Sequence, residues 1–401
     1  MKKLHYGWVV WLGCVLMTLC ICNLGITTYA VYQPYILAQN GFTNAQTSTL
    51  ITVRSLVIFV TVFFTVAYYK WIGLRWGMTL AGLLMALGYA LFGVAESYGV
   101  YCAAAALVGL SYGLGAVLPI AVLLGRWFAR KRTFAQGLTA SVSGLLALSF
   151  PSLVTRLVES LGLRTAFFTE SAVMVLISAV AFLLIRDWPA QKGLEPYGAD
   201  APEETEKVIR RGRKMRKNSW LLLAPALLLT GVTGGVASGH LTMLTTSEGF
   251  DSHIAAMVIT LCSLMSMPGS FLYGWLAEKL STCAANWVFG TLYAVGFILL
   301  CMTGGSMILL YAAVCCYGIG GPMISVGMTA WAADLSTPEQ YDKTLRRFQL
   351  LNSAGGLIFS SFPGILADRF GGSYVPAYIC FAAFAVFILL AVQRTYKANG
   401  A

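Results

Sequence analysis

One arginine, Arg54, lies within an almost unbroken apolar run of the sequence, TLITVRSLVIFVTVFF (residues 49–64). A guanidinium is a planar, permanently charged donor that binds a carboxylate through two parallel hydrogen bonds. At the centre of a membrane-spanning helix such a charge costs about 2.5 to 3.5 kcal/mol, so it should face protein or water rather than lipid. The residue and its setting therefore indicate a binding site for a small anion.

Three roles for Arg54 stay open at this level. Arg54 binds an anionic substrate, it pairs with a carboxylate of a neighbouring helix, or its long side chain reaches back to the outer membrane surface. Thr47, Thr61 and Thr65 recur at helical spacing around it and form a polar stripe, which we expect to face a central cavity. Glu170 is the one carboxylate several residues inside an apolar run, and this scarcity of partners favours substrate binding.

Other polar residues in apolar runs are candidates for the same site. His240, in GVTGGVASGHLTML, has a side chain that titrates near neutral pH, so it is a candidate for proton coupling; the alternative is a hydrogen-bonded gate residue near the outer surface. Asn352 is an amide deep in another run. The remaining candidates are side chains that would surround a small organic acid, although packing is an alternative for each tyrosine: Tyr29, Tyr32, Gln33, Tyr112 and Ser143.

These residues belong to segments long enough to cross a bilayer. Of 401 residues, 58% are hydrophobic and 11% charged, whereas soluble domains are about a quarter charged. A spanning helix needs about 20 apolar residues, and runs without alternation exclude barrel strands. The sequence predicts an all-α polytopic membrane protein with twelve transmembrane helices, at about 8–35, 46–69, 76–95, 99–125, 133–158, 165–185, 219–246, 253–277, 285–303, 306–333, 345–367 and 373–393.

The net charge of +11 is distributed asymmetrically between the loops. With the N-terminus inside, 23 of the 27 Lys and Arg residues fall on the cytoplasmic side. This positive-inside pattern predicts a multi-pass protein of the plasma or inner membrane with both termini cytoplasmic, and it makes a nucleic-acid partner unnecessary. The ten cysteines lack metal-ligand spacing and no nucleotide-binding loop occurs, so we expect no metal, no cofactor and no enzyme activity.

A long polar stretch containing prolines separates six spans from six. Across it, NGFTNAQTSTLITV (40–53) aligns with EGFDSHIAAMVITL (248–261), and SFPSLVTRLVESLGL (149–163) aligns with SFPGILADRFGGSYV (361–375). Parallel repeats of this kind are a transporter plan, with the substrate between the halves. The predicted parts are an N-terminal six-helix bundle (1–187), a cytoplasmic linker (188–217) and a C-terminal six-helix bundle (218–401).

This plan resembles the major facilitator superfamily. Its members carry a Gly-x-Leu-Ala-Asp-Arg type loop after helices two and eight, and GWLAEKL (274–280) is a near match with Glu278 at the acidic position. In the first half, AYYKWIGLRWG (67–77) has Lys70 there instead. The resemblance implies a gating or structural role for this pair, with the latch of the first half altered.

The segment GRWFARKRTFAQGLTASVSG (125–144) is similar to the oxalate/formate antiporter and monocarboxylate transporter families. There, basic residues on helices eight and eleven handle carboxylates, but the matching positions here are Ser270 and Asn352. A single cation on helix two, Arg54, then implies a substrate with one carboxylate.

The resemblance therefore implies a secondary transporter that moves a small organic anion, a monocarboxylate, by alternating access, through proton symport or anion exchange. Alternatives are an exporter of hydrophobic or drug-like compounds, or a transporter-like sensor that binds its ligand without moving it. The expected partners are a small anionic metabolite and membrane lipids, and we expect a monomer.

Overall fold

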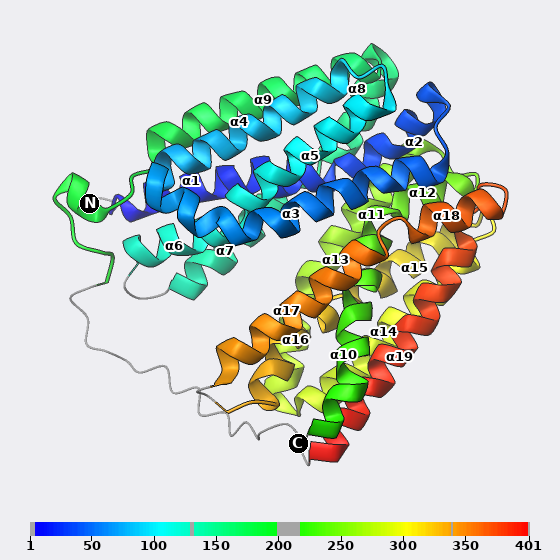
Figure 1. The fold of residues 1–401 in the computed structure, drawn as a ribbon. Coiled ribbons are helices and arrows are strands. Elements are labelled where there is room, and N and C mark those ends of the chain that lie inside the picture. Colours follow the sequence, from blue (N-terminus) through cyan, green and yellow to red (C-terminus); the bar gives the residue numbers. More distant parts are fainter. Residues whose placement is uncertain (1–4, 129–131, 199–216, 338–339, 400–401) are drawn as a thin grey trace. The chain divides into compact units, whose positions relative to one another are not determined.

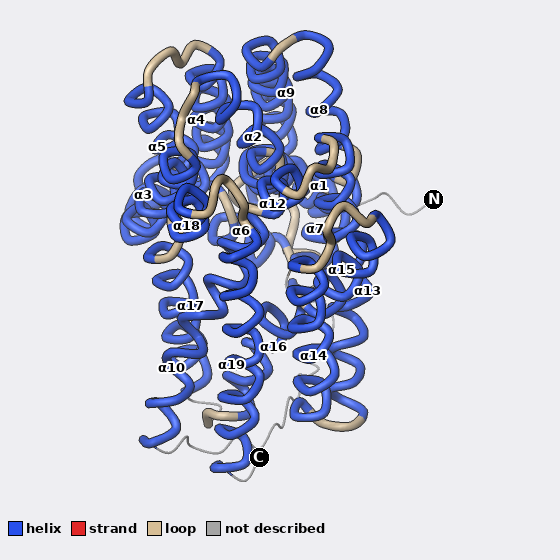
Figure 2. Tube along the Cα trace, turned by 90° about the vertical axis from the view of Figure 1, so that its right-hand side faces the viewer, coloured by secondary structure: helices blue, strands red, loops and turns tan. Residues whose placement is uncertain are grey.

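The computed structural model describes residues 5–128, 132–198, 217–337 and 340–399. Twelve helical segments of these residues are long and apolar enough to cross a membrane, and the described elements are helices joined by short loops (Figures 1 and 2). The all-α fold with twelve spans, predicted from the sequence, is therefore confirmed. Residues 199–216, which form most of the predicted linker, lie outside the described residues, as do residues 1–4 and 400–401 at the termini.

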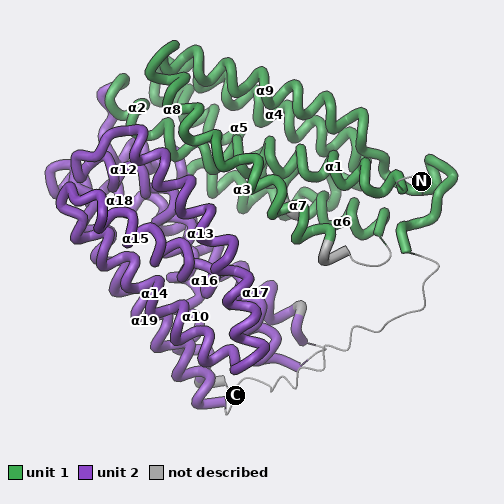
Figure 3. The backbone as a smooth tube through the Cα atoms, turned by 180° about the vertical axis from the view of Figure 1, so that it is seen from behind, with its two compact units in different colours: residues 1–40, 53–205 green, residues 41–52, 206–401 purple. Residues whose placement is uncertain are grey.

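The chain divides into two compact units (Figure 3). The first comprises residues 1–40 and 53–205, and the second comprises 41–52 and 206–401, so that the start of one helix, α3, groups with the second unit. The elements up to the linker are α1 (Gly7–Thr18), η1 (Leu19–Thr27), α2 (Tyr29–Asn40), α3 (Asn44–Ile72), α4 (Leu74–Gly93), α5 (Tyr98–Gly115), α6 (Val117–Trp127), α7 (Arg132–Ala147), α8 (Phe150–Leu161), α9 (Leu163–Leu184) and η2 (Pro189–Lys192).

The second half of the chain repeats this order of long and broken helices. Its elements are α10 (Lys217–Gly231), η3 (Val232–Val236), α11 (Ala237–Gly239), α12 (Leu241–Ser247), α13 (Ser252–Lys279), α14 (Thr282–Cys301), α15 (Met307–Gly320), α16 (Pro322–Asp334), α17 (Tyr341–Ile358), α18 (Phe362–Arg369) and α19 (Val375–Asn399). Their core packs α14 against α15 and α19, and α10 against α17 and α19.

Both copies of the Ser-Phe-Pro motif mark a helix break. Ser149 precedes α8 and Ser361 precedes α18, and in each case a proline stands in the first turn of the new helix. Proline has no amide hydrogen, so it is tolerated at a helix start but cannot continue the preceding helix. The repeat read from the sequence is thus also a repeat of backbone geometry.

The first and seventh spans each contain a π-helical stretch, η1 and η3. π-turns are uncommon and occur frequently at functional sites, because the extra residue per turn redirects the side chains that follow. Immediately after η1, α2 begins at Tyr29 and contains Pro34. The irregular backbone therefore sets the direction of the side chains of α2, where the sequence had placed several candidate residues.

Candidate functional site

Arg54 is buried in the first unit, on α3. Its exposed fraction is 9%, and its Cζ atom lies 5.1 Å from the centre of the Tyr29 ring on α2. A cation over an aromatic face is attracted by the ring, more strongly when both are removed from water. Two guanidinium nitrogens, Nε and Nη1, are buried without a hydrogen-bond partner. Because an unpaired buried charge is costly, these donors are poised for a ligand.

The two structural alternatives for Arg54 find little support in this geometry. No described carboxylate forms an ion pair with it, and the deep acid Glu170 directs its carboxylate to two hydroxyl groups instead. The guanidinium is enclosed rather than extended to an exposed surface. The titratable side chains near it are phenols: Tyr29, Tyr89 and Tyr112.

Tyr29 and Gln33 add further unpartnered polar atoms. They are four residues apart on α2 and so share one face of the helix. The Tyr29 hydroxyl and both amide atoms of Gln33 are buried without a hydrogen-bond partner. Buried polar groups in proteins are nearly always hydrogen-bonded. With Arg54 beside Tyr29, these atoms offer donors and acceptors that a small polar acid would satisfy.

Stacked aromatic rings fix α2 in place. Tyr32 stacks on Phe167 of α9 with ring centres 4.2 Å apart, and Phe92 of α4 lies 5.4 Å from Phe167 and 5.5 Å from Tyr29. Tyr89 of α4 donates to two carbonyl groups of η1, at 2.9 and 3.1 Å. These bonds satisfy carbonyls at the end of the π-helical stretch, and they position the Tyr29 ring that lies against Arg54.

Glu170 on α9 forms a second polar group in the same unit. It is 5% exposed, and its carboxylate accepts hydrogen bonds from the Tyr32 hydroxyl at 2.6 Å and the Thr28 hydroxyl at 2.7 Å. Tyr32, a candidate substrate residue by sequence, therefore binds a protein carboxylate. The sequence marked Glu170 as deep and acidic, but not its pairing with these hydroxyl groups.

The other two candidates of the first unit differ in their surroundings. Tyr112 on α5 is half-buried and lies near the Arg54 guanidinium. Ser143 on α7 is buried, and its hydroxyl donates to the Ala140 carbonyl of its own helix at 3.1 Å. The structure thus brings Tyr29 and Tyr112 towards Arg54, while Ser143 makes a bond within α7.

Gly109 lets α5 approach α3 at the level of Arg54. A Cβ atom on Gly109 would lie 2.5 Å from the Arg54 carbonyl oxygen, and one on Gly113 would lie 2.7 Å from the Thr61 Cβ. Small residues allow the backbones of membrane helices to come this close. The position of the Arg54 backbone therefore depends on the absence of a side chain at Gly109.

We expect Gly109→Val to force α5 away from α3, which lowers stability by about 1–3 kcal/mol, and to weaken acid binding because Arg54 is displaced. Gly99→Val is the matched control on the same helix, because a Cβ there meets no atom within 4 Å. The affinity of both variants for the acid is measured by ligand-induced thermal shift. Equal affinity of Gly109→Val and the wild type would show that this contact does not position Arg54.

His240 lies in the second unit and is fully buried. Its Nδ1 atom is 2.9 Å from the Val236 carbonyl oxygen, and its Nε2 atom is 2.9 Å from the Ser48 hydroxyl. The ring centre of Tyr374 lies 5.9 Å away, and burial raises the pKa of that phenol. Both ring nitrogens are engaged, an arrangement that suits the hydrogen-bonded gate residue, the second of the two roles considered for His240.

Two positions, Ser270 and Asn352, were matched to basic residues of the related families. Both side chains are neutral and form hydrogen bonds within the second unit. Asn352 on α17 is half-buried and donates through Nδ2 to the Thr230 hydroxyl of α10 at 2.9 Å. The Ser270 hydroxyl donates to the Ser266 carbonyl of its own helix at 2.8 Å. Asn352 thus joins two helices of the second unit.

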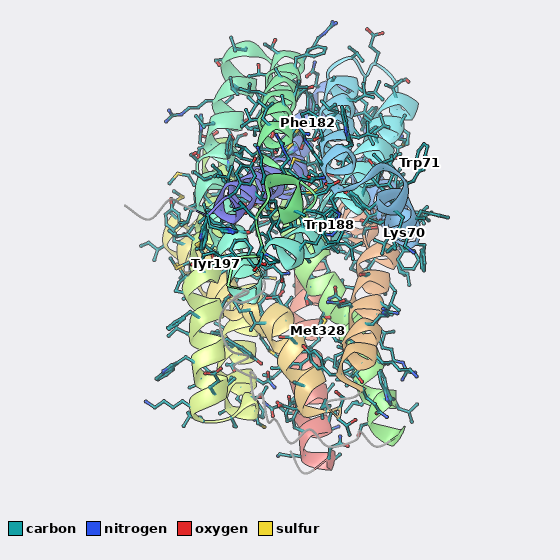
Figure 4. All side chains as sticks on the ribbon, turned by 90° about the vertical axis from the view of Figure 1, so that its left-hand side faces the viewer. Lys70, Trp71, Phe182, Trp188, Tyr197 and Met328 are labelled. Atoms are coloured by element: carbon teal, nitrogen blue, oxygen red, sulfur yellow. The ribbon has the colours of Figure 1, made fainter. Side chains whose placement is uncertain are left out.

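The two residues expected to act in gating, Lys70 and Glu278, are both exposed. Lys70 projects from the end of α3 beside Trp71 (Figure 4). The helix starts that follow these loops are capped by other residues: the Asp187 carboxylate accepts from the Arg75 amide at 2.6 Å, and the Ser281 hydroxyl accepts from the Ala284 amide at 3.1 Å.

Sequence reasoning missed a further helix cap, Asp368. Its carboxylate accepts from the backbone amides of Asn44 and Ala45 at the start of α3, at 2.9 and 2.8 Å. A carboxylate at a helix N-terminus satisfies free amides and is stabilised by the helix dipole. The available signal was the motif ADRFGG (367–372), which the sequence analysis used to align segments and not to identify a helix cap.

Twelve spans, repeated helix breaks in the two halves and a buried arginine with two unpartnered donors define a multi-pass membrane protein of the transporter type. The chain belongs to the Major Facilitator Superfamily, whose sequence profile matches residues 15–341 and 243–400. The resemblance stated from the sequence is thereby confirmed. The protein is a secondary transporter of this family, which is a family of transporters and not of enzymes.

Several relatives share about a quarter of their residues with this chain. It is 24% identical to the uncharacterized MFS-type transporter YhjX of Escherichia coli (strain K12) over 245 residues, covering 60% of each chain. It is 24% identical to monocarboxylate transporter 12 of Rattus norvegicus over 429 residues, covering 98% of this chain and 86% of the relative. It is 24% identical to the oxalate:formate antiporter of Oxalobacter formigenes over 213 residues, covering 52% and 48%.

Solved structures show the same fold at lower identity. The nucleoside transporter NupG superposes with a TM-score of 0.74 at 11% identity, covering 98% of this chain and 100% of that one. A bacterial homologue of the human lysosomal transporter Spinster gives a TM-score of 0.69 at 16% identity, covering 100% and 98%. At this identity the likeness establishes the fold alone.

Proposed function

We propose that this transporter moves a small organic anion with one carboxylate by alternating access, and that Arg54 binds the carboxylate. The observation that carries the proposal is the buried guanidinium whose Nε and Nη1 atoms have no protein partner. A carboxylate satisfies two parallel guanidinium donors at once. The relatives named as monocarboxylate transporters and as an oxalate:formate antiporter point to the same class of substrate.

Tyr29, Gln33 and Tyr112 complete the proposed site in the first unit. The Tyr29 ring holds the guanidinium by a cation–π contact, while its hydroxyl and the Gln33 amide offer hydrogen bonds to polar groups of the acid. Apolar walls around a few placed polar groups are the usual design of small-molecule sites. A cation is disfavoured there, because like charges repel strongly at low dielectric constant.

The proposal places the protein in the cell membrane with both termini cytoplasmic, and it assigns six spans to each of the bundles 1–187 and 218–401. Energy comes from a solute gradient, through proton symport or anion exchange. His240 and Asn352 of the second half remain candidates for proton coupling and for substrate contact, respectively.

A panel of solutes tests the substrate class. Purified protein is assayed by thermal shift and, in liposomes, by uptake of formate, acetate, L-lactate, pyruvate, oxalate, choline and uridine. We expect stabilisation and uptake with at least one monocarboxylate, weaker effects with oxalate and none with choline. A response to choline or uridine without a response to any acid would contradict the proposal, and binding without flux would identify a sensor.

A further inference from the structure

Glu170 is the counterpart of Arg54 in the interior of the first unit. Among the Lys, Arg, Asp and Glu side chains that the structure describes, these two are the buried ones, with exposed fractions of 5% and 9%. They do not pair directly, since Glu170 bonds to Thr28 and Tyr32. Both contact the same helix, α2: Arg54 lies over the Tyr29 ring, and Glu170 accepts from the Tyr32 hydroxyl. The interior thus holds one positive and one negative charge joined through tyrosines.

The groups that face Glu170 are neutral. They are the Tyr32 and Thr28 hydroxyls, which donate to the carboxylate, and the Tyr89 phenol and Cys20 thiol, which lie nearby. Of the other elements against α9, α1 and α2 contain no charged residue. The charged residues of α8 are exposed, and Arg75 of α4 donates at the helix start to the Phe182 carbonyl at 2.9 Å. Among the described residues of this unit, Arg54 is therefore the one buried side chain of opposite charge.

This balance changes when an anion binds. With Glu170 ionised, Arg54 and Glu170 together are neutral, and a bound monocarboxylate would leave a net charge of −1 in a site removed from water. An uncompensated buried charge is costly, and groups avoid it by binding or releasing a proton. Glu170 is the buried acid that can take up that proton.

We propose that Glu170 is the proton-binding site of this transporter, coupled electrostatically to the anion at Arg54, so that one monoanion and one proton are carried together. This rests on the proposed function, because it requires a carboxylate at Arg54. In the step, a water-borne proton forms an O–H bond on a Glu170 carboxylate oxygen, and the same bond breaks to return the proton to water on the other side. The protonated oxygen becomes a donor, so one of the hydroxyls of Tyr32 and Thr28 must give up its bond.

Coupling between two bound species is reciprocal. If an anion at Arg54 favours a proton on Glu170, a proton on Glu170 strengthens anion binding by the same factor. Affinity for the acid should therefore rise as the pH falls from 8 to 6, a range in which formate and L-lactate remain ionised, since carboxyl groups titrate at about pH 4. Glu170→Gln, which mimics protonated Glu170, should bind the substrate acid tightly at both pH 8 and pH 6.

The test uses the purified full-length protein and the probes formate, acetate, L-lactate and pyruvate. We expect wild-type affinity for the bound acid to rise by about tenfold between pH 8 and pH 6, a coupling in the usual range. Glu170→Gln should show no rise, with affinity at pH 8 no weaker than that of the wild type at pH 6. In wild type, adding the acid to weakly buffered protein should take up protons, read by a pH dye; a tenfold rise over two pH units corresponds to an average of about half a proton per bound anion.

Liposomes give the second readout. An imposed pH gradient should drive uptake in wild type, and the initial rate of this uptake should be at least about tenfold lower in Glu170→Gln. The rate of acid-for-acid exchange in the variant should stay within about twofold of the wild-type rate, because exchange requires no net proton movement. Glu159→Gln is the matched control: this exposed acid also accepts from a tyrosine, Tyr35, at 3.0 Å. His240→Gln separates the two proton candidates and should retain the pH response.

Binding without proton uptake in wild type, or a Glu170→Gln variant that keeps pH-driven uptake, would overturn this inference and leave the proposed function standing. Failure of every acid to bind would overturn both. Loss of the pH response in His240→Gln, with Glu170→Gln unaffected, would move the proton site to the second half. If Glu170→Gln does not fold, the absence of proton uptake in wild type still overturns the inference, and proton uptake that persists in His240→Gln excludes the other candidate.

Discussion

We expect Arg54→Gln to abolish binding and uptake of the transported acid, while the protein still folds and inserts. The glutamine amide has about the length to stay beside Tyr29, but it carries no charge and cannot offer the guanidinium fork. Truncating one member of a buried, hydrogen-bonded charge pair costs about 2–5 kcal/mol, and each 1.4 kcal/mol is a tenfold change in affinity. We therefore expect affinity to fall by roughly thirtyfold or more, beyond detection in a thermal-shift assay.

Two further variants make this result specific. Arg54→Lys keeps the charge and loses the planar fork, so we expect intermediate affinity and slow uptake. Arg156→Gln removes an equally charged but exposed arginine of α8 and should leave both properties unchanged. Melting temperature without ligand checks folding. Unaltered uptake by a folded Arg54→Gln protein would remove Arg54 from substrate binding.

The loss should appear in binding as well as in transport. If Arg54 were a structural partner, Arg54→Gln would lower the melting temperature without ligand and leave the affinity of the surviving protein intact. If its role were to reach the membrane surface, neither quantity would change greatly, because a surface contact contributes little. The pattern across three measurements thus distinguishes all the roles considered for this residue.

The spans and the repeat could be predicted from the sequence, because lipid imposes long apolar helices and because related halves keep their helix-breaking prolines. Arg54 could be singled out for the same reason, because a charge in a run such as TLITVRSLVIFVTVFF must face protein or water rather than lipid. These signals depend only on the residues of one segment and on the lipid around it, so they can be predicted from the sequence.

The partners of the polar residues could not be predicted in this way. Tyr32 and Glu170 are 138 positions apart, and their hydrogen bond depends on how α2 packs against α9. The π-helical stretch η1 is as apolar as an ordinary helix, so its effect on Tyr29 has no signature in hydropathy. The cap at Asp368 similarly joins the start of α3 to the last turn of α18, 324 residues away. The candidate residues could be predicted from side-chain chemistry, whereas their partners depend on how the helices pack.

Helix packing in the second unit depends on paired glycines, and the largest stability effect is expected there. At Gly355 of α17 an added Cβ would overlap the Leu228 carbonyl oxygen of α10, and at Gly231 of α10 it would overlap the Asn352 carbonyl oxygen. A backbone oxygen cannot rotate away as a side chain can. We expect Gly355→Ala to push α10 and α17 apart, at a cost of about 1–3 kcal/mol, and to weaken the bond between Asn352 and Thr230.

Gly274→Ala should have the opposite sign. A Cβ on this glycine of α13 meets no atom within 4 Å, so alanine there only removes the backbone freedom of glycine, which stabilises a helix by up to about 1 kcal/mol. Thermal unfolding of the two variants in detergent, followed by tryptophan fluorescence, should therefore move in opposite directions from the wild type. Equal shifts would mean that α10 and α17 do not meet through their glycines, because glycine at position 355 would then be as replaceable as at an open site.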